Sequence, residues 1–292
     1  MACVSCACVK LASSVMTPHR PTTVLVHGLD SSKQTWTDVL GDLTRAGYPA
    51  IAVDLRGHGE SPLGDPASFS ATALAQDVLA AVREHGVQPG GAVLVGHSMG
   101  GRIAMRAAAI DCKSTARLLK AVVVEDMDLR VRDRATTDLT AAQQAELRSF
   151  ESDSGRAFAD WASAREALLR WYGGDEARVD SWKGSRVRAL PAGRGWWSDL
   201  NPAAQRLARA RVLASTDGAE AWDSLRDQPT KVYLWYADAP GTVCRVDGPG
   251  GIDDMSRRLP TAQVRLFVGS DHSIHRSARE DFVKAVRQVV DS

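Results

Sequence analysis

Short apolar runs recur along the first part of the chain, and each is followed by a turn or by a segment with helical spacing. The runs are residues 21–26 (PTTVLV), 50–54 (AIAVD), 91–95 (GAVLV) and 121–124 (AVVV). They are continuously apolar, which is typical of strands that helices cover on both faces. Segments with helical spacing at 36–46, 70–85 and 98–109 separate them. This alternation predicts an α/β fold with a mostly parallel central sheet.

The pattern changes in the middle of the chain. Between residues 129 and 228 we find no convincing strand, and helix-like segments dominate at 141–150, 156–171 and 202–214. Apolar runs resume at 231–235 and 263–268, and a final amphipathic helix is predicted at 278–290. We therefore predict a core made of residues 21–128 and 229–292, a helical cap inserted at 129–228, and an N-terminal tail at 1–20.

Charge and composition narrow the functional classes. The 292 residues include 36 Lys and Arg against 35 Asp and Glu, so the formal net charge is +1. This balance gives no reason to expect nucleic acid, an anionic membrane or a strongly charged substrate as a partner. No apolar run approaches the roughly 20 residues of a membrane span, and no basic residues precede the apolar part of the N-terminus as in a secretory signal. We predict a cytoplasmic protein.

Three of the five cysteines crowd near the N-terminus, and the odd count argues against a disulfide framework. Cys3, Cys6 and Cys8 are potential metal ligands. However, the sequence offers no second cysteine pair or Cys/His knuckle to complete a tetrahedral site. We therefore predict a functionally neutral tail, and we expect no metal or organic cofactor.

The segment Gly96-His97-Ser98-Met99-Gly100 joins a predicted strand directly to a predicted helix. In so tight a turn, side chains two residues before and two residues after the serine would clash, so both positions require glycine. The serine is expected to adopt a strained backbone conformation that lifts its hydroxyl clear of the sheet, in front of the helix N-terminus. An ordinary glycine-rich turn is the alternative, but the strand before it and the helix after it favour a nucleophile.

The first predicted strand ends in His27-Gly28-Leu29. A loop backbone at this place would offer a second N–H group to an oxyanion. We therefore predict an oxyanion hole made by the backbone N–H groups of Leu29 and Met99. The alternative is a simple turn at a strand end. We favour the oxyanion hole, because the chain also contains the predicted nucleophile turn.

Four segments carry a resemblance to a known family. They are VLVHGLDSS at 24–32, DLRGHGES at 54–61, VGHSMGG at 95–101 and GSDHSIH at 269–275. In order and spacing they resemble the α/β-hydrolase family, in particular its capped esterase, lipase and perhydrolase-like members. The resemblance implies an α/β-hydrolase fold with Ser98 as the nucleophile. It also implies that His27, His58 and His97 are structural or supporting positions.

A serine nucleophile needs a general base. His272 follows the last predicted strand, where the resemblance places the catalytic base, and we favour it. His275 is the competitor, because one helical turn would place it on the same side. The family usually has glycine just before this histidine, whereas this chain has Asp271.

The acid that orients the base has two candidates, because the chain order must be serine, acid, histidine. Asp126 follows the strand at 121–124, and Asp238 follows the strand at 231–235. Most family members use the later place, whereas a subset of small esterases uses the earlier one. We favour Asp126 and keep Asp238 as the alternative. Glu125 is less suitable as the acid, because the strand pleat should point its side chain to the face of the sheet opposite that of Asp126.

Six of the eight tryptophans fall in the predicted cap. They are Trp161, Trp171, Trp182, Trp196, Trp197 and Trp222. Most are expected to form the cap's own core. Trp196 and Trp197 are our candidates for contact with the substrate, because they follow two glycines in a predicted loop. Arg102, directly after the nucleophile motif, is expected at a surface position of its helix.

These residues together predict a serine hydrolase. It would cleave an ester-like small molecule, such as a carboxylic ester, a thioester or a lactone, through an acyl-enzyme intermediate. The rivals are acyl transfer, cyclisation or perhydrolysis at the same site, and a non-catalytic ligand-binding receptor, because a fold alone does not determine function.

Overall fold

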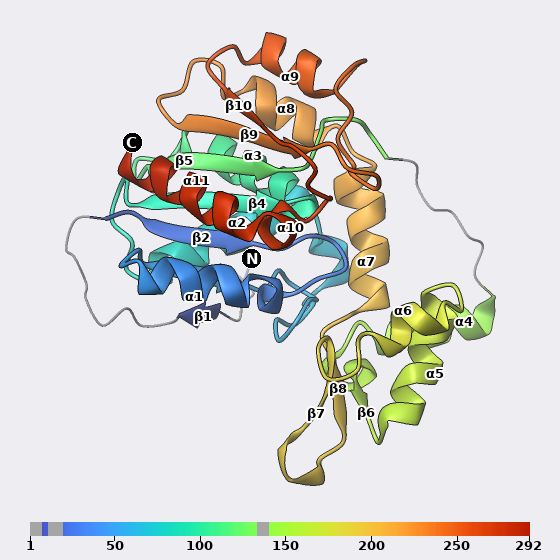
Figure 1. Cartoon of the computed structure of the whole chain (residues 1–292). Helices are drawn as coiled ribbons and strands as arrows, with labels where there is room; N and C mark the ends of the chain where they lie inside the picture. Colours follow the sequence, from blue (N-terminus) through green and yellow to red (C-terminus); the bar gives the residue numbers. More distant parts are fainter. Residues whose placement is uncertain (1–7, 11–19, 133–139) are drawn as a thin grey trace.

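A computed structural model of the chain describes residues 8–10, 20–132 and 140–292 (Figure 1). In these residues the central sheet has seven strands, in the spatial order β1-β3-β2-β4-β5-β9-β10. The strands are β1 (Cys8–Lys10), β2 (Thr22–Val26), β3 (Ala50–Val53), β4 (Ala92–His97), β5 (Leu119–Glu125), β9 (Lys231–Ala237) and β10 (Gln263–Phe267). All neighbouring strands pair in parallel except β1 and β3. The predicted mostly parallel sheet is confirmed.

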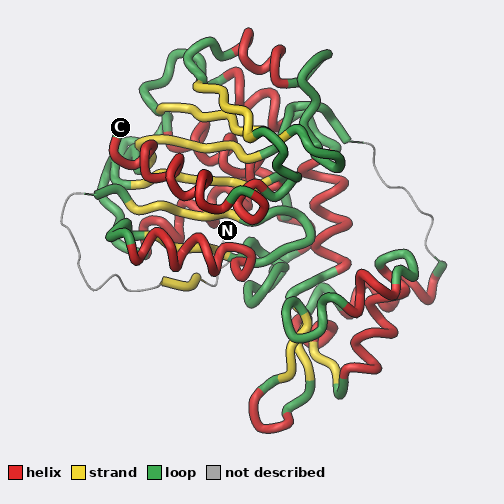
Figure 2. The backbone as a smooth tube through the Cα atoms, viewed as in Figure 1, coloured by secondary structure: helices red, strands yellow, loops and turns green. Residues whose placement is uncertain are grey.

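Helices cover both faces of this sheet (Figure 2). On one face lie α1 (Thr37–Arg45) and α11 (Arg279–Asp291), whose apolar side chains join one buried cluster. On the other lie α2 (Ala71–Glu84), α3 (Met99–Asp111), α8 (Asp217–Asp223) and α9 (Ile252–Arg258), which share a second cluster. Along β2, Val24 and Val26 enter one cluster and Leu25 enters the other. Because both faces are buried at the centre of the sheet, strands β2, β3 and β4 are mostly apolar, whereas the edge strand β10 is largely exposed.

The predicted N-terminal tail contributes one strand to the sheet. Cys8–Lys10 forms β1, which pairs antiparallel with β3 and continues the sheet beyond it. An edge strand such as β3 presents unpaired backbone groups that a neighbouring segment can bind. These three residues therefore belong to the sheet, whereas the boundary of the tail at residue 20 and its functional neutrality stay predictions. Cys3 and Cys6 lie outside the described residues.

Residues between β5 and β9 form a more varied set of elements than predicted. Besides α8, the α-helices are α4 (Ala141–Ser149), α5 (Trp161–Trp171), α6 (Glu176–Asp180) and α7 (Pro202–Ala208), and a π-helix (Arg209–Leu213) continues α7. A small antiparallel sheet also forms here, from β6 (Ala157–Phe158), β8 (Trp196–Ser198) and β7 (Val187–Ala189). The expectation of no strand in this region is wrong. These strands have two or three residues each, too few to show an alternating pattern.

This segment is divided between two apolar clusters. Ala164, Leu168, Val179, Val187 and Leu200 pack in a cluster of their own. By contrast, the stretch from α7 to α8 packs on the main sheet, where Trp222 is fully buried and donates a hydrogen bond to the Met255 carbonyl at 3.0 Å. Figure 1 shows α4, α5, α6 and the small sheet beyond α7, away from the main sheet. The proposed boundaries of the cap at 129 and 228 stay a prediction.

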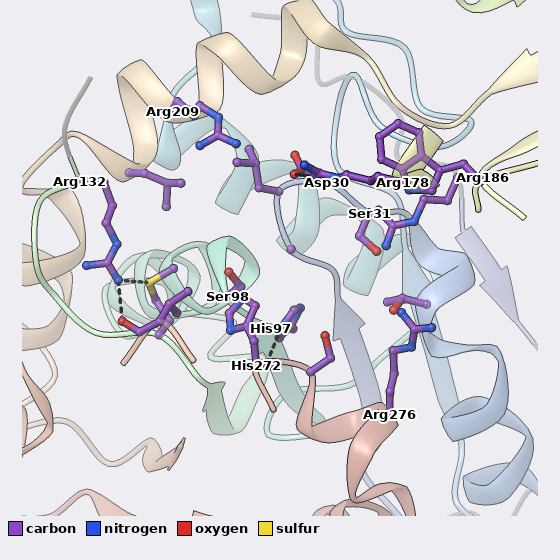
Figure 3. Close-up of a pocket in the computed structure, with 18 residues that line it drawn as sticks. Asp30, Ser31, His97, Ser98, Arg132, Arg178, Arg186, Arg209, His272 and Arg276 are labelled. Atoms are coloured by element: carbon purple, nitrogen blue, oxygen red, sulfur yellow. Dashed lines mark hydrogen bonds and ion pairs between the residues drawn. The ribbon is translucent and has the colours of Figure 1, made fainter. Parts of the chain in front are cut away.

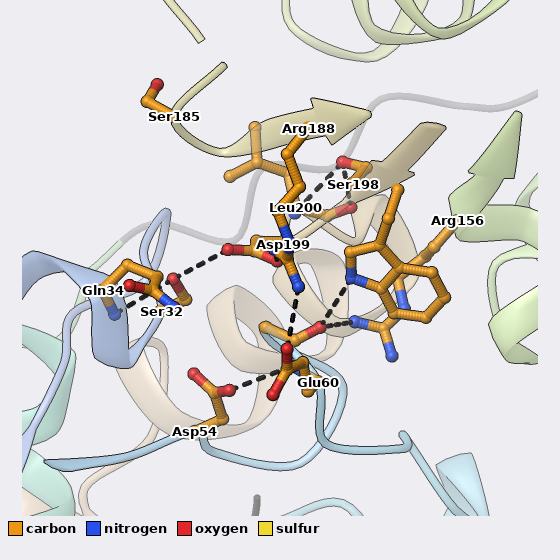
Figure 4. A network of polar contacts seen from close by, with 12 residues as sticks. Ser32, Gln34, Asp54, Glu60, Arg156, Ser185, Arg188, Ser198, Asp199 and Leu200 are labelled. Atoms are coloured by element: carbon orange, nitrogen blue, oxygen red, sulfur yellow. Dashed lines mark hydrogen bonds and ion pairs between the residues drawn. The ribbon is translucent and has the colours of Figure 1, made fainter. Parts of the chain in front are cut away.

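A network of charged side chains ties the β7–β8 hairpin to the main body (Figure 4). Arg188 bridges Asp199 at 2.5 Å and Glu60 at 2.9 Å. The ammonium group of Lys33 bonds both Glu60, at 2.6 Å, and the buried Asp54, at 2.7 Å. Because several charges of both signs share partners, this network is a stronger tether than isolated surface pairs.

Within the described parts of the chain, every helix falls short of the length and apolar character that a membrane-spanning helix requires.

Candidate active site

Ser98 lies at the junction of β4 and α3, as the motif predicts. Its backbone has φ 53° and ψ −121°, in a region that non-glycine residues rarely adopt. The Ser98 N–H donates a hydrogen bond to the Glu125 carbonyl at 2.8 Å, which ties the turn to the neighbouring strand. The side chain faces the cavity shown in Figure 3. A strained, buried turn therefore presents a hydroxyl to open space.

The glycines on either side of Ser98 are required by close backbone packing. A Cβ atom on Gly96 would overlap with the carbonyl of Gly100. A Cβ atom on Gly100 would lie 2.5 Å from the Val26 carbonyl oxygen. Neither neighbour is a flexible side chain that can move away. The prediction that both positions must be glycine is confirmed.

His272 and Asp126 lie within hydrogen-bond distance. The Nδ1 atom of His272 is 2.7 Å from Oδ2 of Asp126. The Asp126 carboxylate is fully buried and also accepts the N–H groups of Ala237 at 3.3 Å and Val243 at 3.1 Å. Because an ionised carboxylate only accepts hydrogen bonds, the proton of a neutral His272 resides on Nδ1. This leaves Nε2 with a lone pair, as a general base requires.

Asp238, the alternative acid, has a different partner. Its Oδ1 accepts the backbone N–H of Gly269 at 2.6 Å, and its side chain is exposed. Asp271, the unusual neighbour of His272, is also exposed and accepts the N–H of Ser273 at 2.8 Å. Both aspartates therefore shape the loop that carries His272, whereas Asp126 bonds the imidazole itself.

His275, the competing base, belongs to a second and deeper pair. Its Nδ1 lies 2.8 Å from Oε1 of Glu125, and its Nε2 lies 3.0 Å from the Thr35 hydroxyl. Both members are buried, with side chains 1% and 0% exposed. Burial raises the pKa of Glu125 to about 7. Burial, helped by the positive charge of Arg276, lowers the pKa of His275 to about 3. Both groups are therefore held towards their neutral forms.

His97 supports the backbone of His272. Its Nε2 donates to the His272 carbonyl at 2.9 Å, and the two rings lie 4.6 Å apart. Burial lowers the pKa of His97 to about 3, so the ring stays neutral and Nδ1 has a lone pair. His97, Glu125 and His275 form a cluster of potential metal ligands. Within the described residues, one donor atom from each lies within 4.8 Å of the others. Their hydrogen bonds to His272 and Thr35 favour a structural role over metal binding.

The predicted oxyanion loop lies opposite Ser98. Two histidines stabilise it, since His58 Nε2 lies 3.0 Å from the Leu29 carbonyl and His27 Nδ1 lies 2.7 Å from the Gly28 carbonyl. A Cβ atom on Gly28 would lie 3.3 Å from that of Ser98, so the loop approaches Ser98 closely. Among the described residues, the N–H groups of Leu29 and Met99 donate no backbone hydrogen bond. They are therefore available to a substrate oxygen.

The cavity in front of Ser98 has a volume of about 460 Å³. Trp182 lines it, whereas Trp196 and Trp197 do not, contrary to the prediction. Trp196 instead packs on Trp161 with ring centres 5.6 Å apart. The indole N–H of Trp197 donates to the Gly59 carbonyl at 3.2 Å (Figure 4). Their place in the central strand of the small sheet turns both tryptophans towards packing contacts.

Arg102 is buried, which corrects its expected surface position. Its guanidinium donates to the carbonyls of Asp128 at 3.1 Å and Arg130 at 2.6 Å, and burial lowers its pKa to about 10. The side chain is 1% exposed. It therefore ties the helix behind Ser98 to the segment that follows Asp126.

Comparison with known proteins identifies the family to which this fold belongs. The model of the Alpha/beta hydrolase family matches residues 23–285. The chain belongs to this family. The sn-1-specific diacylglycerol lipase ABHD11 of Mus musculus is 24% identical over 268 residues, which cover 91% of this chain and 80% of that protein. The 2-(acetamidomethylene)succinate hydrolase of Mesorhizobium japonicum is 25% identical and covers 93% of this chain and 88% of that protein.

Solved structures agree on the fold. The crystal structure of E-2-(acetamidomethylene)succinate hydrolase superposes with a TM-score of 0.63 at 25% identity, covering 93% of this chain and 92% of that one. The family member described here is therefore an α/β-hydrolase-fold enzyme of the hydrolase class. Its similarity to a lipase supports ester hydrolysis in general.

Proposed function

We propose that this hydrolase cleaves an ester-like bond through a covalent acyl-enzyme on Ser98. The observation that carries the proposal is the 2.7 Å hydrogen bond between His272 and Asp126, beside the cavity that both Ser98 and His272 line. The three residues follow one another in the order serine, aspartate, histidine, as in other α/β hydrolases. The backbone strain at Ser98 further supports a functional role.

In the proposed acylation step, His272 Nε2 accepts the Ser98 hydroxyl proton while Oγ attacks the carbonyl carbon. The carbonyl oxygen becomes an oxyanion and accepts hydrogen bonds from the N–H groups of Leu29 and Met99. Asp126 stabilises the imidazolium through Nδ1. The intermediate then collapses, and the leaving group departs with the proton from Nε2.

Deacylation repeats these steps with water as the nucleophile. His272 removes a proton from water, the resulting hydroxide attacks the acyl carbon, and Ser98 recovers its proton as the acid product leaves. The substrate is a small-molecule carboxylic ester, thioester or lactone. No step in this scheme requires a group beyond the protein and water.

The proposed cap has a definite part in this scheme. Trp182, Arg186 and Leu213 all belong to residues 129–228, and all line the cavity in front of Ser98. Side chains from this segment would therefore determine which acyl groups fit. This arrangement supports the predicted role of the segment as a cap over the sheet's carboxyl edge.

A fluorophosphonate probe with intact-mass detection tests the nucleophile. We expect one covalent adduct on the wild-type protein and none on Ser98→Ala. Ser273→Ala is the matched control, because Ser273 lines the same cavity and should leave labelling intact. An adduct that persists on Ser98→Ala, or no adduct on the wild type, would overturn the proposal.

A further inference from the structure

Arginine is concentrated around the cavity that holds Ser98, although the whole chain is almost neutral. The described lining contains a single carboxylate, Asp30, and five arginines: Arg132, Arg178, Arg186, Arg209 and Arg276. The net charge of the chain is +1. Folding has therefore gathered positive charge at one place, and such a cavity attracts anions.

Two of these arginines are already neutralised by the protein. Arg132 lies 2.7 Å from a carboxylate oxygen of the buried Asp128. Arg178 lies 3.1 Å from Asp30. These pairs hold the two guanidinium groups in place and leave little of their charge for a ligand.

Arg186 and Arg276 are different. In the part of the chain that the structure describes, neither guanidinium has a carboxylate within 4.0 Å or donates a hydrogen bond. Both lie on the same side of Ser98 as Ser31, opposite Arg132 (Figure 3). Burial lowers the pKa of Arg186; the negative charge of Asp30 opposes this shift, and the positive charge of Arg276 adds to it. An anion placed here would relieve the repulsion between the two side chains.

The two arginines come from different parts of the fold and have well-defined backbones. The Arg186 N–H donates to the Trp182 carbonyl at 3.0 Å, and the Arg186 carbonyl accepts the Asp199 N–H at 2.8 Å. Arg276 lies in the short helix α10 (Ile274–Ser277), four residues after His272. The proposed cap and the core thus each contribute one guanidinium near the base.

The opposite wall of the cavity combines apolar side chains with Arg132 and Arg209 (Figure 3). Arg132 lies 3.9 Å from the Met127 sulfur and donates to the Val243 carbonyl at 3.3 Å, which places these lining residues on the Arg132 side. Arg186 and Arg276 also border a wider depression of about 1030 Å³. A substrate that lies across Ser98 would therefore meet a mixed wall with Met127, Val243 and the ion-paired Arg132 at one end. At the other end it would meet the open wall that carries Arg186 and Arg276.

We propose that the substrate is an ester with an anionic oxygen group, a carboxylate or a phosphate, that binds between Arg186 and Arg276 while its scissile carbonyl faces Ser98. This inference rests on the proposed function of Ser98. A planar guanidinium group is suited to such a ligand, because it can donate two parallel hydrogen bonds to carboxylate or phosphate oxygens.

Three p-nitrophenyl esters of matched chain length test the proposal. They are the hexanoate ester, which is neutral, the mono-adipate ester, which carries a carboxylate, and the 5-phosphonopentanoate ester, which carries a phosphonate in place of a phosphate. We expect a higher kcat/KM for at least one anionic ester than for the hexanoate, and the better anion identifies the preferred group. This preference should decrease with added salt, because ions screen the exposed Arg276.

Single variants assign the preference to residues. Arg186→Gln should reduce the anionic-to-neutral ratio of kcat/KM by roughly tenfold or more, mainly through KM. Arg276→Gln should reduce it by roughly threefold, because this side chain is exposed. Arg257→Gln, on the exposed side of α9, is the control and should leave the ratio unchanged.

The two proposals fail in different ways. If wild type hydrolyses the hexanoate in a Ser98-dependent manner without preferring either anion, the arginine proposal is wrong and the serine mechanism stands. If no ester is hydrolysed, calorimetric titration of adipate into wild-type and Arg186→Gln protein decides the arginine proposal alone. Binding that Arg186→Gln abolishes supports the anion site, and equal or absent binding refutes it.

Discussion

Two histidine–carboxylate pairs lie at the carboxyl edge of the sheet, and they differ in access to the cavity. His272 bonds Asp126 at 2.7 Å, and its side chain is 28% exposed at the cavity wall. His275 bonds Glu125 at 2.8 Å and is 1% exposed. The two acids are neighbours on the chain, and the two histidines are three residues apart. Glu125 is the last residue of β5, whereas Asp126 lies just beyond it with a left-handed backbone (φ 43°), so the two side chains do not follow one strand.

This difference shows that a histidine–carboxylate pair is not by itself a catalytic device. In the Asp126 pair, one nitrogen bonds the acid and the other is left for the cavity. In the deeper pair, the second nitrogen of His275 bonds the Thr35 hydroxyl, and the ring packs 4.2 Å from Trp36. We therefore propose that the first pair is catalytic and that the second supports the loop of His272.

The largest expected effect is on activity, and it should distinguish Asp126 from Glu125. Asp126→Asn should reduce kcat on p-nitrophenyl hexanoate by roughly 10³–10⁴-fold, because an amide favours the wrong tautomer of His272. Glu125→Gln should retain kcat within roughly tenfold, since its partner histidine does not face the substrate. Steady-state kinetics on both purified variants checks this. The reverse order of losses would exchange the roles of the two pairs.

Substitution of the two histidines should affect stability in the opposite order: His275 should matter more for stability than His272. His275→Ala should lower the free energy of unfolding by about 2–4 kcal/mol, because it leaves a cavity and removes a partner of the buried Glu125. His272→Ala should change it by about 1 kcal/mol or less. Urea unfolding followed by circular dichroism measures both. Equal losses would show that His275 is not the structural member.

The pKa of Glu125 predicts how stability depends on pH. Burial raises it from 4.5 to about 7 in the folded state. Between these values the folded protein keeps a proton that the unfolded chain releases, so this group's contribution to stability is present below pH 4.5 and is lost as the pH rises to 7. Glu125→Gln lacks this dependence. Its stability relative to wild type should therefore increase by about 1–3 kcal/mol between pH 5 and pH 8.

Urea titrations of wild type and Glu125→Gln at pH 5 and pH 8 measure this difference. His97 and His275 are common to both proteins, and their lowered pKa values reduce stability at acidic pH in each. A pH-independent difference between the two proteins would show that Glu125 is ionised throughout.

The smallest effect is expected at Asp238. Asp238→Asn should change kcat/KM by less than about twofold, because an asparagine oxygen can still accept the Gly269 N–H that Asp238 binds at 2.6 Å. The hexanoate assay used for Asp126→Asn provides the direct comparison. A loss as large as that of Asp126→Asn would mean that Asp238 contributes to orienting the base.

The turn around Ser98 could be predicted from the sequence because its determinants are local. Gly96 and Gly100 are needed wherever a strand enters a helix through so tight a turn, and the structure shows the backbone contacts that require them. The buried strands were predictable for a similar reason, since continuous apolar runs indicate burial on both faces.

Features that depend on distant partners were less predictable. The choice between Asp126 and Asp238 depends on how the turn near Val243 packs against β5, which no local pattern reveals. Trp196 and Trp197 were misplaced because their strand pairs with two other strands that are also very short. Arg102 was misplaced because the carbonyls that bury it come from a later segment.

By itself, the sequence determined the nucleophile turn, the strand order along the chain and the family, because these follow from neighbouring residues and their spacing. Only the tertiary structure decided which carboxylate meets His272 and how charge is distributed at the site. A net charge of +1 gave no reason to expect a strongly charged substrate, yet five arginines line the cavity in front of Ser98. Net charge is a sum over the whole chain, whereas a ligand responds to the charges that folding places within a few ångströms of it.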